Sequence, residues 1–99
     1  MEKDIVKKIK EYLESQGCLV YKYHGSIYTI KGFTDLFGMI SMDSKSGCAG
    51  RMFFLEVKLP NKKLRLTQES FIQSVLEKGA IAMVVRSLEE VKEKFSLFL

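Results

Sequence analysis

The sequence is poor in the residues that build metal clusters, disulfides and membrane spans. Its 99 residues include two cysteines, one histidine, one proline and no tryptophan. Cys18 and Cys48 belong to no C-x-x-C or Cys/His pattern, so a structural zinc site is not expected and the thiols should be reduced. No apolar run approaches the about 20 residues that a membrane-spanning helix needs, and the charged first residues lack the apolar segment of a signal peptide. We therefore expect a cytoplasmic protein that does not enter a membrane.

What the sequence does have is a moderate excess of positive charge. Sixteen Lys and Arg residues against twelve Asp and Glu residues give a formal net charge of +4 and a pI near 9.1. This excess is compatible with a phosphate-bearing partner but does not by itself identify one. With 46% hydrophobic residues, no repeats and no low-complexity segment, the chain is predicted to form a single globular domain over residues 1–99.

The hydrophobic pattern predicts three helices and four strands. The helices are expected over residues 2–16, 67–78 and from 88 onward, and the strands over 18–23, 35–41, 51–58 and 80–85, while 27–31 are ambiguous. A short loop joins the second and third strands, which should therefore pair antiparallel. A helix joins the third and fourth strands, and such a crossover predicts that these two run parallel. The predicted fold class is α/β, with a four-stranded mixed sheet flanked by helices on both faces.

Glycines and capping residues mark the ends of the expected helices. Gly17 and Gly79 are placed to end the first two. Thr67 is the expected N-cap of the second helix, and Ser87 with Glu90 forms a capping box at the third. The apolar stripes that should face the core recur at helical spacing. They are Ile5, Ile9, Tyr12 and Leu13 in the first helix, Phe71, Ile72, Val75 and Leu76 in the second, and Leu88, Val91 and Phe95 in the third.

The third expected strand ends in two charges. Alternation along the strand puts Glu56 and Lys58 on one face, opposite the face of Phe53, Leu55 and Val57. A carboxylate and an ammonium at the end of a hydrophobic strand are costly to bury without a partner. A divalent metal ion with a phosphate is one candidate partner. The alternative is an exposed strand end with two solvated charges, and a Glu-x-Lys motif alone favours that alternative.

A second carboxylate changes this balance. Asp35 begins the strand that should pair with the strand carrying Glu56, so the two carboxylates can converge on one cation. Mg²⁺ prefers oxygen ligands and accepts one or two carboxylates with several waters, and the Val57 carbonyl would suit the same set. Lys58 beside the metal could hold, orient or help deprotonate an attacking water. This arrangement is typical of metal-assisted phosphodiester hydrolysis, with two unrelated surface carboxylates as the alternative.

A basic loop follows directly. Lys62, Lys63 and Arg65 come just after Lys58 and before the second expected helix. A charge run of this kind is usually a solvated loop. Its place beside Lys58 leaves a second interpretation open, in which the three side chains contact DNA phosphates.

Together these motifs resemble the PD-(D/E)xK nuclease superfamily, and within it the VRR-Nuc branch, the virus-type replication–repair nuclease domain. The motifs that carry the resemblance span nearly the whole chain: Glu2 at the first helix, Gly32-Phe33-Thr34-Asp35-Leu36 before a hydrophobic strand, Glu56-Val57-Lys58 at the end of the next, Leu66-Thr67-Gln68 at the following helix, and Gly79-Ala80 with Val84-Val85-Arg86-Ser87 around the last strand. Members of this family often carry proline just before the aspartate. Thr34 stands there in this chain, and we expect changed loop stiffness rather than lost activity.

The resemblance implies a restriction-endonuclease-like αβββαβ core and a role for each of five residues. Asp35 and Glu56 resemble the metal-binding carboxylates, and Lys58 resembles the catalytic lysine. Gln68 resembles the helix glutamine beside the catalytic centre, and Glu2 resembles the first-helix glutamate that completes the acidic pocket. The implied cofactor is Mg²⁺ or Mn²⁺. The implied activity is structure-selective cleavage of DNA, with branched DNA such as four-way junctions as the substrate.

The resemblance also bears on assembly and origin. Stand-alone members of the family resemble Holliday-junction resolvases, which place two active sites on a two-fold axis, so we expect a homodimer. Phe95, Leu97, Phe98 and Leu99 crowd the C-terminus and offer apolar surface for it. A viral or phage protein acting in the host cell is a further expectation.

Two alternatives stay open at this point. One is a non-catalytic DNA-binding or dimerisation module of the same fold, against which the joint retention of Asp35, Glu56 and Lys58 argues. The other is a nicking or restriction partner of another protein.

Overall fold

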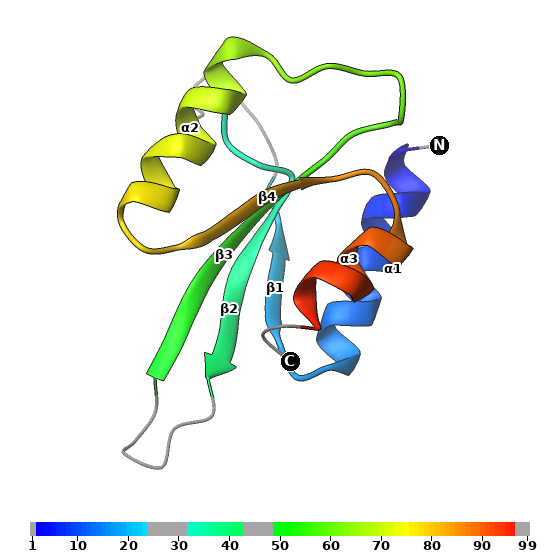
Figure 1. Ribbon diagram of the computed structural model, residues 1–99. Helices are drawn as coiled ribbons and strands as arrows, with labels where there is room; N and C mark the ends of the chain where they lie inside the picture. Colours follow the sequence, from blue (N-terminus) through cyan, green and yellow to red (C-terminus); the bar gives the residue numbers. More distant parts are fainter. Residues whose placement is uncertain (1, 24–31, 43–48, 97–99) are drawn as a thin grey trace.

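The computed structural model describes residues 2–23, 32–42 and 49–96, and its elements follow the predicted order (Figure 1). They are α1 (Glu2–Ser15), β1 (Leu19–Lys22), β2 (Leu36–Met42), β3 (Ala49–Val57), α2 (Leu66–Glu77), β4 (Ile81–Val85) and α3 (Leu88–Phe95). The ambiguous segment 27–31 and the C-terminal residues 97–99 lie outside the described residues. Each predicted helix and strand is present, with only small displacements of its ends.

The four strands form one sheet in the order β1-β2-β3-β4, and both pairing predictions are confirmed. β2 and β3 pair antiparallel, with Leu36 opposite Leu55. β3 and β4 pair parallel, with Phe53 opposite Ile81. β1 completes the sheet antiparallel to β2. The fold is therefore the mixed α/β sheet that the sequence predicted.

Helices cover both faces of this sheet. Figure 1 shows α1 and α3 together on one side and α2 on the other. The α1 and α3 side holds the main core, whose buried members include Val6, Ile9, Leu13, Leu36, Ile40, Phe53, Leu55, Val57, Val91 and Phe95. The rings of Phe53 and Phe95 meet edge to face with 5.5 Å between centroids, which ties β3 to α3. The apolar stripes predicted for α1 and α3 do face this core, with Ile5, Tyr12 and Leu88 partly buried.

α2 is covered less completely than the sequence predicted. No residue of this helix is fully buried, and Leu76, which was predicted to face the core, keeps 43% of its surface exposed. The reason is the narrow contact of α2, which packs mainly against β4 at the edge of the sheet.

The start of α2 also differs from the prediction. Thr67 lies inside the helix, and Arg65 takes the N-cap position with an extended backbone. The cap comes from an amide rather than a hydroxyl, because Oε1 of Gln68 accepts a 2.9 Å hydrogen bond from the Arg65 backbone N–H. This bond is the half of a capping box in which a residue at N3 reaches back to the N-cap.

Part of the α2 face of the sheet stays uncovered. Leu19, Met39 and Met52 lie opposite one another across β1, β2 and β3, and each leaves roughly half of its surface exposed. Between this apolar row and the ends of the strands lie Phe37 and Phe54. None of the described helices is both long and apolar enough to cross a membrane.

Candidate active site

The pairing of β2 with β3 sets Asp35 opposite Glu56. Leu36 lies opposite Leu55, and one step further along the same antiparallel register Asp35 meets Glu56. Because side chains alternate along a strand, both carboxylates lie on the face that α2 covers, together with Phe37. The structure thus brings together the two carboxylates that the sequence placed on neighbouring strands.

Asp35 is held through both its side chain and its backbone. Its Oδ2 accepts a hydrogen bond of 2.8 Å from the Val57 backbone N–H, and its carbonyl accepts one of 2.9 Å from the Tyr23 backbone N–H. The N–H and C=O of one strand residue point toward the same neighbouring strand, so the Val57 carbonyl also faces the Asp35 side. The three predicted ligands, Asp35, Glu56 and the Val57 carbonyl, are therefore neighbours at one end of the sheet.

The bend before Asp35 packs directly against α2. Gly32 has a φ of +80°, which favours glycine, and a side chain there would collide with the Thr67 carbonyl. Thr34 is fully buried, and its hydroxyl donates a 3.0 Å hydrogen bond to the Leu36 carbonyl. This hydrogen bond restrains the backbone between the bend and the start of β2.

Glu56 is the buried centre of the site, with 3% of its surface exposed. Its Oε2 accepts a 3.0 Å hydrogen bond from Nε2 of Gln68 and lies 3.6 Å from Nζ of Lys58. Its Oε1 is buried and has no hydrogen-bond partner within the described part of the chain. Burial, and then the nearby Asp35 carboxylate, raise the pKa of Glu56 to about 7, while Lys58 acts in the opposite direction. The carboxylate can therefore accept one more cationic or proton-donating partner.

Lys58 and Gln68 complete the cluster. Only 14% of the Lys58 side chain is exposed, and its ammonium approaches Glu56 from the end of β3. Gln68 lies in the first turn of α2, after the loop that begins at Lys58, and its side chain reaches back to Glu56. The position of Gln68 was expected only from the family resemblance, and the geometry brings it into contact with the carboxylate.

The oxygen donors of the cluster fit a hard divalent cation. Among residues 2–23, 32–42 and 49–96, no group of three or more His, Cys, Asp or Glu side chains is arranged to hold a metal ion. The site offers two carboxylates and the Val57 carbonyl, and Mg²⁺ is commonly held by one or two carboxylates with several waters. Within this pair of carboxylates, the buried Oε1 of Glu56 has no hydrogen-bond partner among the described residues and is the oxygen that such an ion would bind. The residues present therefore fit Mg²⁺ or Mn²⁺ in a site that keeps waters.

Glu2 does not join this pair. It opens α1 and forms no three-acid group with Asp35 and Glu56. The physical reason is the pleat of the sheet, which directs both carboxylates toward α2, whereas α1 covers the opposite face (Figure 1). The role in an acidic pocket that the resemblance implies for Glu2 stays a prediction.

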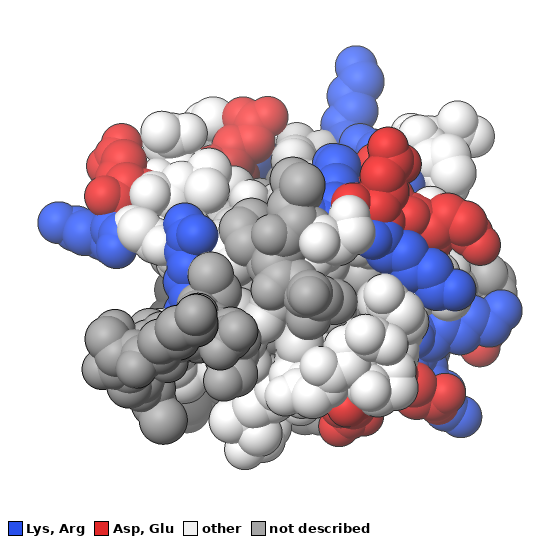
Figure 2. All heavy atoms as spheres, turned by 60° about the horizontal axis from the view of Figure 1, so that its bottom comes forward, with Lys and Arg blue, Asp and Glu red and all other residues white. Residues whose placement is uncertain are grey.

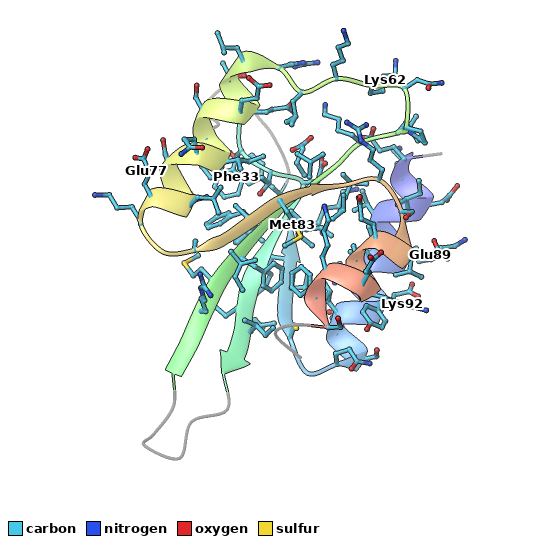
Figure 3. The ribbon with its side chains drawn as sticks, viewed as in Figure 1. Phe33, Lys62, Glu77, Met83, Glu89 and Lys92 are labelled. Atoms are coloured by element: carbon cyan, nitrogen blue, oxygen red, sulfur yellow. The ribbon has the colours of Figure 1, made fainter. Side chains whose placement is uncertain are left out.

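The basic residues Lys62, Lys63 and Arg65 are exposed on the loop between β3 and α2. On the face drawn in Figure 2, basic and acidic side chains are intermixed and neither sign dominates. Figure 3 shows Lys62 on the outer side of the loop, away from the sheet. The loop therefore presents three basic side chains to solvent.

Sequence reasoning missed two features beside the site. One is Arg86, whose Nη1 donates to the carbonyls of Leu59 and Lys62. In the sequence, Arg86 showed only as a basic residue at the end of an apolar strand.

The other is Phe33, which packs between α2 and the sheet and stacks on Tyr23 with 4.2 Å between ring centroids (Figure 3). No pattern could pair these two rings, because they lie on separate segments of the chain.

Comparison with known proteins adds no family to this description. No protein-family model matches the chain, and no curated protein gives a significant match. The nuclease resemblance therefore rests on the motifs and on the arrangement of the residues that carry them.

Proposed function

We propose that this protein is a metal-dependent endonuclease that hydrolyses phosphodiester bonds in DNA. The observation that carries the proposal is the cluster at the end of β3, where buried Glu56 faces Asp35 and is contacted by Lys58 and Gln68. A merely structural strand end would leave the Glu-x-Lys charges solvated, and here they are almost fully buried. Two carboxylates that can hold a divalent ion, with a lysine beside them, suit metal-assisted hydrolysis of a phosphodiester.

Each residue of the cluster has its own role in this proposal. Asp35 and Glu56, with the Val57 carbonyl, would hold the ion, and the Val57 N–H keeps the Asp35 carboxylate in place. When bound, Mg²⁺ or Mn²⁺ supplies Lewis-acid stabilisation of the charge that develops on the phosphate. The Lys58 ammonium orients the attacking water beside Glu56. Gln68 restrains the Glu56 carboxylate through its Nε2 hydrogen bond.

The proposed substrate is branched DNA, such as a four-way junction, as the family resemblance implies. Lys62, Lys63 and Arg65 support a DNA partner because they are exposed and follow Lys58 directly, so phosphates flanking the cleaved bond would pass near them. Cytoplasmic location and a viral or phage origin belong to the same proposal.

Cleavage assays test the activity. Duplex, flap, fork and four-way junction DNA are incubated with the protein in Mg²⁺, in Mn²⁺ and in a chelator. We expect ion-dependent cleavage that Asp35→Ala, Glu56→Ala and Lys58→Ala each abolish, with circular dichroism unchanged. Glu89→Ala, which removes an exposed carboxylate on α3, is the matched control and should cleave like the wild type. Activity of Glu56→Ala near the wild-type level would overturn the assignment.

The runner-up function gives a different result in the same experiment. A non-catalytic DNA-binding or dimerisation module would bind DNA without cutting it in either ion, and Glu56→Ala would leave binding unchanged. The burial of Glu56 argues against this alternative, because a binding module gains nothing from a carboxylate that is costly to bury.

A homodimer is the proposed assembly, since two sites on a two-fold axis would match the symmetry of a four-way junction. The contact was predicted at Phe95, Leu97, Phe98 and Leu99. Phe95 is buried against Phe53 in the core and is not available for a contact between subunits, and the other three lie outside the described residues. Light scattering at micromolar concentration, with and without junction DNA, decides the state. A species of 11.4 kDa under both conditions would overturn the dimer.

A further inference from the structure

The residues after Lys58 form a turn whose two ends are bound by a single side chain. The Lys62 backbone N–H donates to the Leu59 carbonyl at 3.0 Å, which closes the turn. Nη1 of Arg86 donates to the same Leu59 carbonyl at 2.7 Å and to the Lys62 carbonyl at 2.9 Å. Pro60 predisposes the turn to form, because its ring presets the backbone for the second turn position. The two hydrogen bonds from Arg86 therefore stabilise a turn that Pro60 favours and fix its position beside the end of β4.

Arg86 is itself held firmly. It follows β4 directly, and its backbone N–H donates to Oε1 of Glu90 at 2.7 Å. The Glu90 N–H donates in turn to Oγ of Ser87 at 3.1 Å, which caps α3. The guanidinium thus projects from the junction between β4 and the capped helix α3. Such an anchor is more rigid than the exposed loop that it holds.

The end of β4 also forms a hydrogen bond with the backbone of Lys58. The Lys58 backbone N–H donates to the Val85 carbonyl at 3.0 Å, and Val85 precedes Arg86 in the chain. Adjacent residues of the β4–α3 junction therefore fasten both Lys58 and the turn that follows it. Hydrogen bonds donated by a charged guanidinium are stronger than those between neutral groups, and arginine keeps its charge at any physiological pH.

We propose that Arg86 is a positioning residue for the reaction, acting through the Leu59–Lys62 turn to hold the Lys58 ammonium beside Glu56. This proposal rests on the proposed endonuclease function. A lysine side chain has four rotatable bonds, so the backbone on both sides of Lys58 must be fixed for its ammonium to stay 3.6 Å from the carboxylate. Arg86 fixes the backbone on the C-terminal side.

The test compares Arg86→Met with Arg51→Met. Nε of Arg51 donates to the Gly79 carbonyl at 2.8 Å, so this control removes another arginine–carbonyl bond, at the other end of β3. We expect Arg86→Met to lower kcat on the best DNA substrate by about 10- to 100-fold, with an unchanged slope of log affinity against log salt. Arg51→Met, corrected for its folded fraction, should keep the wild-type kcat.

Two results would overturn the proposal. One is a kcat for Arg86→Met within about twofold of the wild type. The other is a loss found only in KM and in the salt slope, which would mean that Arg86 serves phosphate binding by the loop and not Lys58. If Arg86→Met fails to fold, Arg86→Lys replaces it, because the shorter ammonium cannot reach both carbonyls in the same geometry. The kcat of Arg86→Lys should also fall, and a wild-type kcat would overturn the proposal.

Amide hydrogen exchange separates this proposal from the endonuclease function. The Lys62 and Lys58 amides, bonded to Leu59 and Val85, should exchange faster in Arg86→Met than in the wild type, and unchanged in Arg51→Met. A wild-type protein that cleaves no DNA would overturn the function, whatever the exchange rates. Unchanged exchange at both amides in Arg86→Met would overturn the positioning role, whatever the activity.

Discussion

Gln68 holds Glu56 with one end of its amide and the start of α2 with the other. Its Nε2 donates to Oε2 of Glu56 at 3.0 Å, and its Oε1 accepts the Arg65 N–H at 2.9 Å. One side chain therefore closes the first helical turn and restrains the buried carboxylate. A change that frays α2 should consequently loosen a candidate metal ligand.

Replacing Gln68 should affect stability and activity together. In Gln68→Ala the Arg65 N–H loses its cap and Glu56 loses a donor, so we expect a loss of about 1–2 kcal/mol in unfolding free energy. Loss of a residue that orients a metal ligand should also lower kcat/KM by about 10- to 100-fold. Gln73→Ala, an exposed glutamine of the same helix, is the control for denaturation and cleavage assays. Equal stability and equal kcat/KM in the two variants would show that the hydrogen bonds from Gln68 to Glu56 and Arg65 contribute to neither.

Gly32 and Gly17 allow backbone strain to be separated from a steric clash. Both have positive φ, +80° and +88°, so alanine at either position costs about 1–2 kcal/mol through strain. A side chain at Gly32 would in addition collide with the Thr67 carbonyl, whereas at Gly17 it would have no atom of the described residues within 4 Å. Gly32→Ala should therefore unfold at lower denaturant than Gly17→Ala and lose activity per folded molecule. Comparable stability and activity in both variants would contradict the close packing of the bend on α2.

The sequence predicted the sheet and the pair Asp35 and Glu56 because both depend on local pattern and register. Alternation and loop length determine which strands pair and which side chains share a face. The strand register then sets Asp35 opposite Glu56 without further information. Lys58 follows from the same alternation, two residues beyond Glu56.

Contacts that cross between segments could not be predicted in the same way. The amide of Gln68 takes over the cap expected from Thr67, because its other end is held by a buried carboxylate that only the folded sheet supplies. The bonds from Arg86 to the Leu59–Lys62 turn join parts of the chain far apart in sequence. Glu2 was expected beside the pair only from the resemblance. It forms no three-acid group with Asp35 and Glu56 among the described residues, and its role stays a prediction.

The raised pKa of Glu56 predicts a pH-dependent stability in the absence of divalent ions. Its ordinary value of 4.5 rises to about 7 in the folded protein through burial and the Asp35 charge. The folded state thus binds the Glu56 proton more tightly than the unfolded state does. The contribution of this proton to the free energy of unfolding is fully present below about pH 4.5 and is lost as pH rises to about 7. The loss amounts to about 3 kcal/mol at most.

The variant Glu56→Gln tests this contribution, because it removes the titration while keeping the shape. In a chelator at about pH 8 it should unfold at higher denaturant than the wild type, and near pH 4.5 the two should converge. Glu89→Gln, at an exposed position, controls for the change of charge. A wild-type protein as stable as Glu56→Gln at about pH 8 would show that the buried, ionised Glu56 carboxylate does not destabilise the fold.

Divalent ions should restore the stability that the wild type loses when Glu56 is ionised. Binding to the native state at about ten times the dissociation constant stabilises it by about 1.4 kcal/mol, which for a domain of this size raises Tm by several degrees. We expect Mg²⁺ or Mn²⁺ to raise the Tm of the wild type at about pH 8, with a smaller rise in Asp35→Asn and Glu56→Gln. Chelation should return the wild-type value. Equal shifts in all three proteins would place the ion elsewhere.

The basic loop should govern DNA affinity rather than the chemical step. Lys63 and Arg65 are exposed on the chain between Lys58 and α2, where they can neutralise phosphates without entering the carboxylate cluster. Removing one true phosphate contact should reduce the slope of log affinity against log salt by about one unit, because one fewer counterion is released. Lys63→Ala and Arg65→Ala should therefore show reduced slopes in a titration over salt concentration, with kcat retained. Lys8→Ala, an exposed lysine of α1 on the opposite face, should keep the wild-type slope, and a loop variant that behaves like this control makes no phosphate contact.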